Sequence, residues 1–262
     1  MNNNPIGLFD SGVGGTSIWK EIHQLLPYEN TIYLADSLNA PYGYKSKEEI
    51  ISLSIKNTEL LLKEGCKVIV VACNTATTNA INVLRERFRV PFIGIEPAIK
   101  PAALQSKSKS IGILATKGTL NSELFSLATE EFTKDIMITE VIGEGLVSLI
   151  EKGSLLSSEI SSLLEKFLKP MLANNIDHLV LGCSHYPYLI PQLTKLLPNN
   201  IKIIDSGEAV AKQTKSIILK NKLQKKASNQ PDLQFITNSS DKTLKLLLNE
   251  YLEKIYIETR KF

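Results

Sequence analysis

Short apolar, β-branched runs alternate along the chain with longer stretches in which apolar residues recur at helical spacing. This alternation is typical of βαβ units on a mostly parallel sheet, whose strands are buried on both faces and therefore apolar throughout. The predicted strands are Ile6–Phe9, Thr31–Ala35, Lys67–Val71, Phe92–Ile95, Ser110–Leu114, Ile136–Val141, His178–Leu181, Lys202–Ile204 and Leu233–Ile236. The longer predicted helices are Ser46–Glu64, Thr75–Arg89, Ser157–Ala173 and Glu208–Asn221.

Two junctions rich in turn-forming residues interrupt this pattern. They are Glu96-Pro-Ala-Ile-Lys-Pro101 and Asp205-Ser-Gly207. The chain of 262 residues is long enough for two compact domains. We therefore predict a first domain from residues 1–97 and 208–262, with a second domain of residues 98–207 inserted into it. The expected fold class is α/β, with two similar flavodoxin-like, doubly wound domains and the site between them.

The composition is that of an ordinary globular protein, with 43% hydrophobic and 22% charged residues. It excludes a disordered chain and a fibrous repeat. The formal net charge of +3 is too close to balance to favour nucleic acid or an anionic membrane as a partner. No window approaches the roughly 20 apolar residues of a membrane-spanning helix, and the N-terminus does not resemble a secretory signal.

The chain has three cysteines, Cys66, Cys73 and Cys183, and no CxxC pair. An odd number without such a pair favours neither a disulfide framework nor a zinc ribbon, and it suits a reducing compartment. We therefore expect a cytoplasmic protein. Cys66 precedes a predicted strand without polar neighbours, so we interpret it as a small buried apolar residue.

Cys73 and Cys183 lie in two segments with the same order of residue types. Val68-Ile-Val-Val-Ala-Cys-Asn-Thr75 and His178-Leu-Val-Leu-Gly-Cys-Ser-His185 both run from an apolar strand through a small residue to a cysteine and then a polar residue. Each cysteine thus leaves the carboxyl end of a strand, where open α/β sheets bind ligands. We expect a helix to follow each cysteine and its N-terminus to favour the thiolate. Two such half-sites, one per domain, would face each other across a cleft.

Paired cysteines of this kind suit one type of chemistry best. A thiolate beside a base is a nucleophile in Cys-His hydrolases, but one cysteine and one histidine suffice there. Two equivalent acid/base groups on opposite faces of one carbon are what stereoinversion requires, because one removes a proton and the other returns one. A metal site formed by Cys73, Cys183, His185 and Asp10 is a third alternative.

The turn Asp10-Ser-Gly-Val-Gly-Gly15 follows the first strand and allows two interpretations. A dinucleotide site is one, although Ser17 stands where the third glycine belongs and an ionised Asp10 would repel a pyrophosphate. The other is a tight turn at which Asp10 and Ser11 present polar atoms to a small ligand. Asp36 ends the second strand ahead of a loop whose Tyr42 hydroxyl and backbone are suited to hold a carboxylate.

Taken in order, six motifs resemble those of the bacterial glutamate racemase family, in the aspartate/glutamate racemase superfamily. They are Asp10-Ser-Gly-Val-Gly-Gly15, Ala40-Pro-Tyr-Gly43, Ala72-Cys-Asn-Thr-Ala76, Gly94-Ile-Glu-Pro-Ala98, Leu181-Gly-Cys-Ser-His-Tyr-Pro187 and Asp205-Ser-Gly207. The resemblance implies a cofactor-independent, metal-free isomerase that interconverts L- and D-glutamate and supplies D-glutamate for peptidoglycan. It also implies two α/β domains with the active site between them, and a homodimer.

The resemblance also implies a role for each matching residue. Cys73 would take the α-proton from D-glutamate and Cys183 from L-glutamate. Asp10 and His185 would assist the two cysteines, with Glu151 as a further acid near the histidine. The implied substrate-binding residues are Asp10, Ser11, Tyr42, Gly43, Asn74, Thr75, Thr116, Thr119, Ser184 and His185.

Two positions depart from the family's usual pattern. Ser184 stands where threonine is usual, which keeps the hydroxyl and loses a methyl group. Val141-Ile-Gly143 stands where Ala-Cys-Pro is common, ahead of the segment that carries Glu151. Two other functions stay open: racemisation of aspartate or another acidic amino acid, and a non-catalytic protein that binds a ligand in the same cleft.

Overall fold

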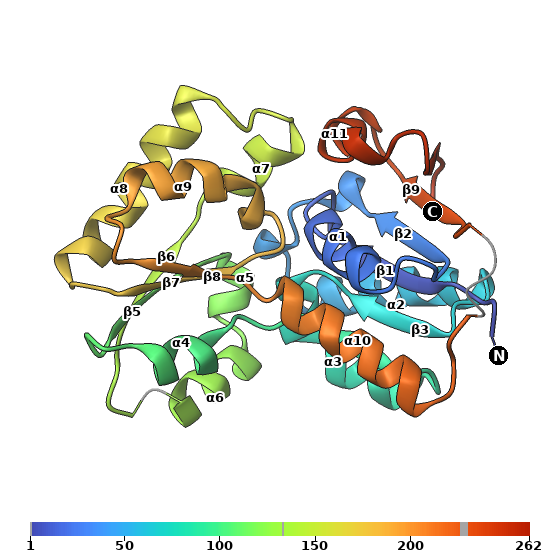
Figure 1. Cartoon of the computed structure of the whole chain (residues 1–262), viewed down its shortest axis with the longest axis horizontal. Helices are drawn as coiled ribbons and strands as arrows, with labels where there is room; N and C mark the ends of the chain where they lie inside the picture. Colours follow the sequence, from blue (N-terminus) through green and yellow to red (C-terminus); the bar gives the residue numbers. More distant parts are fainter. Residues whose placement is uncertain (1, 133, 226–229) are drawn as a thin grey trace.

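Two parallel β-sheets lie side by side and form two lobes (Figure 1). This computed structural model describes residues 2–132, 134–225 and 230–262. The first sheet contains β1 (Ile6–Asp10), β2 (Thr31–Ala35), β3 (Val68–Val71), β4 (Phe92–Gly94), β9 (Leu233–Thr237) and β10 (Tyr256–Thr259). The second contains β5 (Ser110–Ala115), β6 (Met137–Ile142), β7 (His178–Gly182) and β8 (Lys202–Ile204).

The two sheets repeat one strand order. The second sheet runs β6-β5-β7-β8, and the first contains the corresponding run β2-β1-β3-β4, extended by β9 and β10 beyond β2. Every pairing is parallel, and the register places Phe9 beside Val71 in the first sheet and Ala115 beside Gly182 in the second. In both sheets the chain reverses its direction of winding between the first and third strands, so β1/β3 and β5/β7 are topological switch points.

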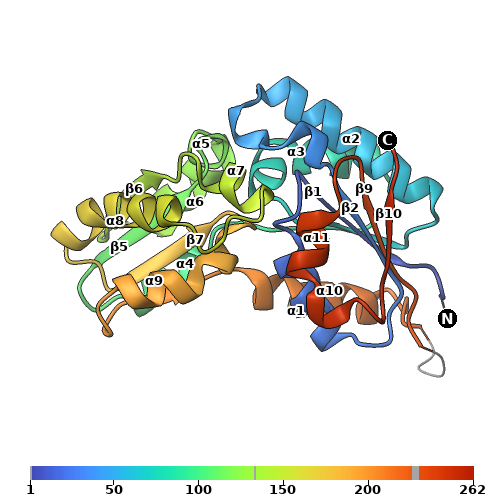
Figure 2. The same ribbon diagram turned by 90° about the horizontal axis from the view of Figure 1, so that it is seen from above.

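Helices cover both faces of both sheets (Figure 2). The first lobe has α1 (Thr16–Leu25), α2 (Lys47–Lys63), α3 (Asn74–Arg87), α10 (Gly207–Lys220) and α11 (Lys242–Leu247). The second has α4 (Ile99–Gln105), α5 (Lys117–Leu120), α6 (Glu123–Phe132), α7 (Leu146–Glu151), α8 (Ser158–Ala173) and α9 (Ile190–Leu196). Short 3-10 helices lie at Ser37–Asn39, Tyr42–Tyr44, Tyr186–Leu189 and Asn249–Tyr251.

Burial on both faces explains why the strands read as continuous apolar runs. In β1, Leu8 packs into the cluster under α1, α10 and α11, whereas Phe9 packs into the cluster under α2 and α3. In β7, Leu181 and Val180 likewise point to opposite sides, toward α8 and toward α4. The central strands of both sheets, such as β1 and β7, therefore have no solvated face on which polar alternation would be expected.

The chain passes between the lobes twice, and the two crossings lie together, because the Ser206 hydroxyl donates to the carbonyl of Glu96. After the first crossing α4 packs against β7, and after the second α10 packs against α1. Among the described residues, no helix is long and apolar enough to cross a membrane.

The predicted fold class is confirmed, and each predicted strand is present with ends shifted by one residue at most. The four longer helices are also present. The pattern missed β10 and the short helices α4, α5, α6, α7, α9 and α11. β10 is an edge strand with no fully buried residue, so it lacks the apolar run that marks the others.

Candidate active site between the two sheets

The carboxyl ends of the strands at the two switch points carry the predicted chemistry. Asp10 ends β1, and Cys73 follows β3 as the N-cap of α3. Cys183 follows β7 directly, and Thr116 follows β5 as the N-cap of α5. The corresponding strands of the two sheets therefore present the two cysteines, as the shared residue order predicted.

Both cysteines open into one small cavity, with an empty volume of about 240 Å³. Cys73 is 4% exposed and Cys183 is 6% exposed. The other lining residues are Ser11, Pro41, Tyr42, Gly43, Asn74, Thr75, Thr116, Val147, Ser184 and His185. Most of the predicted site residues thus share one cavity. Asp10, Glu151 and Thr119 do not line it and instead contact residues that do.

Cys73 is held at the first turn of α3, where its Sγ accepts a hydrogen bond from the Ala76 amide at 3.5 Å. Even so, burial and the nearby carboxylate of Asp10 raise the pKa of Cys73 well above its usual value, while the Ala76 and Ser11 amides lower it only in part. The N-terminus of α3 thus favours the thiolate, as expected, but desolvation outweighs its effect on the pKa of Cys73.

Cys183 has a different environment from the one predicted. The segment after it is a turn followed by the 3-10 helix at Tyr186–Leu189, so Cys183 does not cap an α-helix. Instead its Sγ lies 3.8 Å from His185 Nδ1. On the other side of the imidazole, Nε2 lies 2.5 Å from Oε1 of Glu151. A carboxylate at this distance accepts a proton, which places the hydrogen on Nε2 and turns Nδ1 toward the sulfur.

The protonation of His185 follows from these neighbours. Burial by itself would lower the pKa of His185, but the hydrogen bonds with Cys183 and Glu151 and the charge of Asp10 raise it well above the usual value. The Cys183 sulfur and the Glu151 carboxylate thus both stabilise the protonated form of the imidazole. Glu151 is thus joined to the site through the histidine, in agreement with its predicted place near it.

Asp10 connects the glycine-rich turn to the second lobe. Its Oδ2 accepts hydrogen bonds from the amides of Gly12 and Gly15, both at 3.1 Å, and its Oδ1 accepts one from the Ser184 hydroxyl at 3.0 Å. Burial raises the pKa of Asp10, while the charge of His185 lowers it. Asp10 is completely buried, so it reaches the cavity only through its neighbours.

The glycines of this turn allow the two lobes to approach each other. A Cβ on Gly12 would lie 1.9 Å from Glu151 Oε1, and one on Gly14 would lie 2.1 Å from His185 Nδ1. The Val13 amide donates to Glu151 at 2.7 Å, and the Gly14 amide faces His185 Nε2 at 3.2 Å. The amides of residues 12–15 are therefore directed at side chains of this protein, which excludes the dinucleotide interpretation of the turn.

Several polar groups of the cavity are available to a ligand. Both side-chain polar atoms of Asn74 are buried and have no hydrogen-bond partner among the described residues. Thr75, Thr116 and Thr119 form a triangle of hydroxyls, with oxygen separations of 2.8, 3.0 and 3.3 Å. An unpartnered buried amide is costly, so a polar ligand in this cavity would remove that cost.

Tyr42 lines the cavity, but its hydroxyl donates to Asp36 and accepts from Asn57 at 3.1 Å. Burial and the adjacent Asp36 raise the pKa of Tyr42 well above its usual value. The predicted use of this hydroxyl for a carboxylate is therefore not supported, because its proton is already donated. The amides at the start of the 3-10 helix Tyr42–Tyr44 have no partner within that helix and remain suited to this task.

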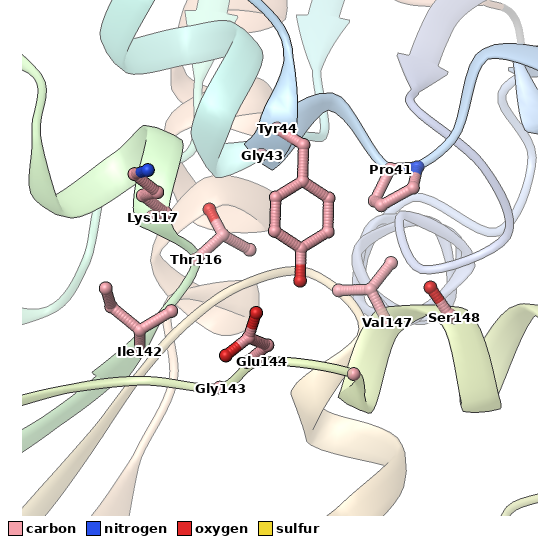
Figure 3. Close-up of a pocket in the computed structure, with 11 residues that line it drawn as sticks. Pro41, Gly43, Tyr44, Thr116, Lys117, Ile142, Gly143, Glu144, Val147 and Ser148 are labelled. Atoms are coloured by element: carbon pink, nitrogen blue, oxygen red, sulfur yellow. The ribbon is translucent and has the colours of Figure 1, made fainter.

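A second pocket lies next to the cavity and shares Pro41, Gly43, Thr116 and Val147 with it. Figure 3 shows the Tyr44 ring in the middle of this pocket, with Lys117 and Thr116 on one side and Val147 and Ser148 on the other. Tyr44 belongs to the first lobe and faces Glu144 of the second.

Sequence reasoning missed two residues that hold Glu151. The Ser37 hydroxyl donates to Glu151 Oε2 at 3.1 Å, and the Thr243 hydroxyl donates to the Glu151 carbonyl at 2.7 Å. Ser37 follows Asp36, so its position at a strand end was a usable signal. Thr243 lies in α11, more than 30 residues beyond the last recognised motif, and no local pattern marks it. Within the described parts of the chain, no three His, Cys, Asp or Glu side chains form a group suited to a metal ion.

Comparison with known proteins agrees with this geometry. Residues 6–214 match the model of the Asp/Glu/Hydantoin racemase family. A glutamate racemase from Herpetosiphon aurantiacus is 41% identical over 238 residues, which cover 91% of this chain and 94% of that protein. A glutamate racemase from Ralstonia pickettii is 47% identical over 208 residues, which cover 79% and 74% of the two chains.

Solved structures give the same result. A glutamate racemase isoform from Bacillus anthracis superimposes with a TM-score of 0.88 at 30% identity, over 100% of this chain and 99% of that one. The Escherichia coli glutamate racemase, in complex with L-glutamate and the activator UDP-MurNAc-Ala, gives a TM-score of 0.86 at 31% identity, over 98% of both chains. This chain therefore belongs to the Asp/Glu/hydantoin racemase family.

Proposed function

We propose that this protein is a glutamate racemase that uses Cys73 and Cys183 as its two acid/base groups and needs no cofactor. The observation that carries the proposal is the shared cavity, into which the third strand of each sheet delivers one buried cysteine. Two proton-transfer groups that approach one cavity from different lobes can act on opposite faces of one carbon. The curated glutamate racemases that match along most of the chain support glutamate as the substrate.

In the L-to-D direction, the Cys183 thiolate removes the α-proton and becomes a thiol, leaving a carbanion at the α-carbon. The Cys73 thiol then transfers its proton to the opposite face and becomes a thiolate. The D-to-L direction exchanges these roles. Because each cysteine is in the opposite protonation state at the end of a turnover, each must recover its proton state before the same reaction is repeated.

The cavity supplies the rest of the catalysis. The α-proton of an amino acid is very weakly acidic, so the site must stabilise negative charge in the transition state with fixed donors and little water. Asn74 and the amides at Tyr42 and Gly43 are the donors for the carboxylates, together with Ser11, Ser184 and the threonine triangle formed by Thr75, Thr116 and Thr119. Asp10 assists Cys73, and the pair of His185 and Glu151 assists Cys183.

We further propose the biological setting that the activity implies. D-glutamate made by this protein would supply peptidoglycan synthesis in the cytoplasm, and the protein would act as a homodimer without nucleic acid. The domains would be residues 1–97 with 208–262, and residues 98–207. Each boundary falls at one of the two adjacent crossings between the sheets, at Glu96 and Ser206.

The test is proton NMR of L-glutamate with the purified protein in D₂O and no added cofactor, followed by circular dichroism of the same sample. We expect loss of the α-proton signal together with decay of the optical signal. Faster inversion of L-aspartate would show that the substrate is wrong. If neither amino acid reacts, the cleft is a binding site only. Turnover that persists in a Cys73→Ala, Cys183→Ala double variant would contradict the two-cysteine mechanism.

A further inference from the structure

We propose that Cys183 exchanges its proton with bulk water through His185 and Glu151, whereas Cys73 has no such route. This inference rests on the proposed racemisation and adds a property to it, namely that the two cysteines differ in how fast their protons are replaced. Each of them must be reset between turnovers, so such a difference would affect the two directions of the reaction unequally.

The route begins with three groups in line. Cys183 Sγ lies 3.8 Å from His185 Nδ1, and His185 Nε2 lies 2.5 Å from Glu151 Oε1. His185 borders the cavity and Glu151 does not. The imidazole therefore separates the cavity from the carboxylate and contacts both sides.

Glu151 in turn borders a separate, solvent-facing pocket with an empty volume of about 660 Å³. Its lining includes Val13, Ser37, Glu151, Ser239 and Thr243. We call it the Ser37 pocket. Exposure increases along the route, from 1% for the His185 side chain to 14% for that of Glu151. The chain of groups thus runs from the cavity to a carboxylate that water can reach.

Ser37 and Thr243 are positioning residues for this carboxylate. The Ser37 hydroxyl donates to Oε2, the Val13 amide donates to Oε1, and Thr243 holds the carbonyl of Glu151. All three belong to the first lobe, whereas Glu151 and His185 belong to the second. The route therefore exists only where the two lobes are docked, as they are in this structure.

The proton moves in balanced steps. The steps start from neutral His185, which carries its hydrogen on Nε2. The Cys183 thiol gives its proton to Nδ1, while Nε2 gives its proton to Oε1 of Glu151, which leaves a thiolate and a neutral carboxylic acid. Glu151 then gives the proton to water in the Ser37 pocket and becomes a carboxylate again. The reverse sequence returns a proton, or in D₂O a deuteron, to the sulfur.

The carboxylate next to Cys73, unlike that of Glu151, does not border the solvent-facing Ser37 pocket. This carboxylate, Asp10, is completely buried and accepts hydrogen bonds from two turn amides and from Ser184. Asp10 lines neither the cavity nor the Ser37 pocket. A proton on Cys73 is therefore retained when the cavity is occupied, and it returns to the substrate from which it came.

The experiment measures deuterium in unreacted substrate at low conversion in D₂O. Starting from L-glutamate, Cys183 takes the proton, exchanges it and returns deuterium to the same face, so recovered L-glutamate becomes labelled. Starting from D-glutamate, Cys73 returns the original proton. Mass spectrometry of each remaining enantiomer gives the ratio of exchange to inversion, and we expect that ratio to be higher from the L side.

Single substitutions test which residues carry the proton between Cys183 and water. Glu151→Gln keeps the shape of the side chain but cannot pass a proton. The ratio of deuterium exchange to inversion from L-glutamate should therefore fall by at least about tenfold, to the ratio seen from D-glutamate. Ser37→Ala should lower it in the same direction by a smaller factor, as a second variant with an intact carboxylate. The matched control is Ser239→Ala, which lines the same pocket and whose hydroxyl makes no hydrogen bond with the described residues.

The outcomes separate the two proposals. If wild-type protein does not invert glutamate, the proposed function fails. If it inverts glutamate but the exchange ratios from L- and D-glutamate are equal, or if neither Glu151→Gln nor Ser37→Ala lowers the ratio from the L side, the proton route is refuted while the racemase stands.

Discussion

The two half-sites have the same backbone plan and different chemistry. In each sheet the third strand ends at a cysteine beside the first strand, so topology alone brings the two sulfurs to one cavity. Yet Cys73 caps a fourteen-residue helix and has a buried carboxylate as its neighbour, whereas Cys183 precedes a turn and faces an imidazole. Strand order sets where a catalytic group lies, and the side chains around it decide how readily it holds a proton.

The largest effect is expected when either cysteine is removed, because each half-site depends on its own cysteine. Cys73→Ala and Cys183→Ala should each lower inversion by at least about 10³-fold, because one face of the α-carbon loses its proton-transfer group. In D₂O, Cys73→Ala should still exchange the α-proton of L-glutamate through Cys183, whereas Cys183→Ala should exchange that of D-glutamate far more slowly, because Cys73 retains its proton. Proton NMR with each enantiomer measures this. The same exchange pattern in both variants would contradict the assignment of the two faces.

The docking of the half-sites depends on glycines that have ordinary backbone angles. Gly12→Ala should lower kcat/KM by about 10²-fold in both directions, because its Cβ would lie 1.9 Å from Glu151 Oε1 and displace that carboxylate from His185. Steady-state kinetics from both enantiomers measures the effect. Gly65→Ala is the control, since Gly65 has φ +80 and its nearest contact is 3.9 Å away. It should reduce thermal stability and leave kcat/KM unchanged; the reverse pattern would refute the docking role.

Ser184 joins the two half-sites through its hydrogen bond to Asp10 Oδ1 at 3.0 Å. Ser184→Ala removes this donor from a buried carboxylate, which costs about 1.5–3 kcal/mol and should lower kcat about tenfold or more. Ser184→Thr keeps the hydroxyl and should stay within about twofold of wild type. Steady-state kinetics of both variants tests this. Equal losses in the two variants would show that side-chain volume matters more than the hydroxyl.

The smallest expected effect is a pH dependence of stability that differs between two histidines. The folded-state pKa of His185 is raised, so its contribution to stability is complete below the ordinary histidine pKa of about 6.5 and is lost as the pH rises through the raised value. Burial and the charge of Lys254 lower the pKa of His23, so its contribution has the opposite sign and is lost as the pH falls.

Urea unfolding of His185→Asn and His23→Asn across this range measures both contributions. The stability deficit of His185→Asn relative to wild type should shrink as the pH rises above about 6.5, and that of His23→Asn should shrink as the pH falls. Parallel trends in the two variants would contradict the opposite pKa shifts.

Much of the fold could be predicted because both faces of each sheet are buried. A strand such as Val68–Val71 then reads as an unbroken apolar run that needs no knowledge of its neighbours. Edge elements do not carry that signal. Strand β10 is partly exposed, and helix α11 has six residues, so neither shows a periodicity long enough to be recognised.

The candidate site was predictable only in part. Strand ends marked Asp10, Cys73 and Cys183, because parallel strands gather their carboxyl ends at one edge. The protonation of these groups was not predictable. The helix terminus at Cys73 suggested a thiolate, but burial and Asp10 oppose it, and the amount of burial depends on how closely the second lobe covers the first.

By itself, the amino-acid sequence determined the order of strands and helices, the two cysteines at equivalent strand ends and the family to which the chain belongs. These features depend on local hydrophobicity and on residues close together in the chain. Only the tertiary structure decided that Ser37 and Thr243 hold Glu151, that Tyr42 gives its proton to Asp36 and that one cysteine faces an imidazole connected to solvent. The contact between Ser37 and Glu151 joins residues 114 positions apart. The strength of all these contacts depends on burial, which exists only once the two lobes have packed together.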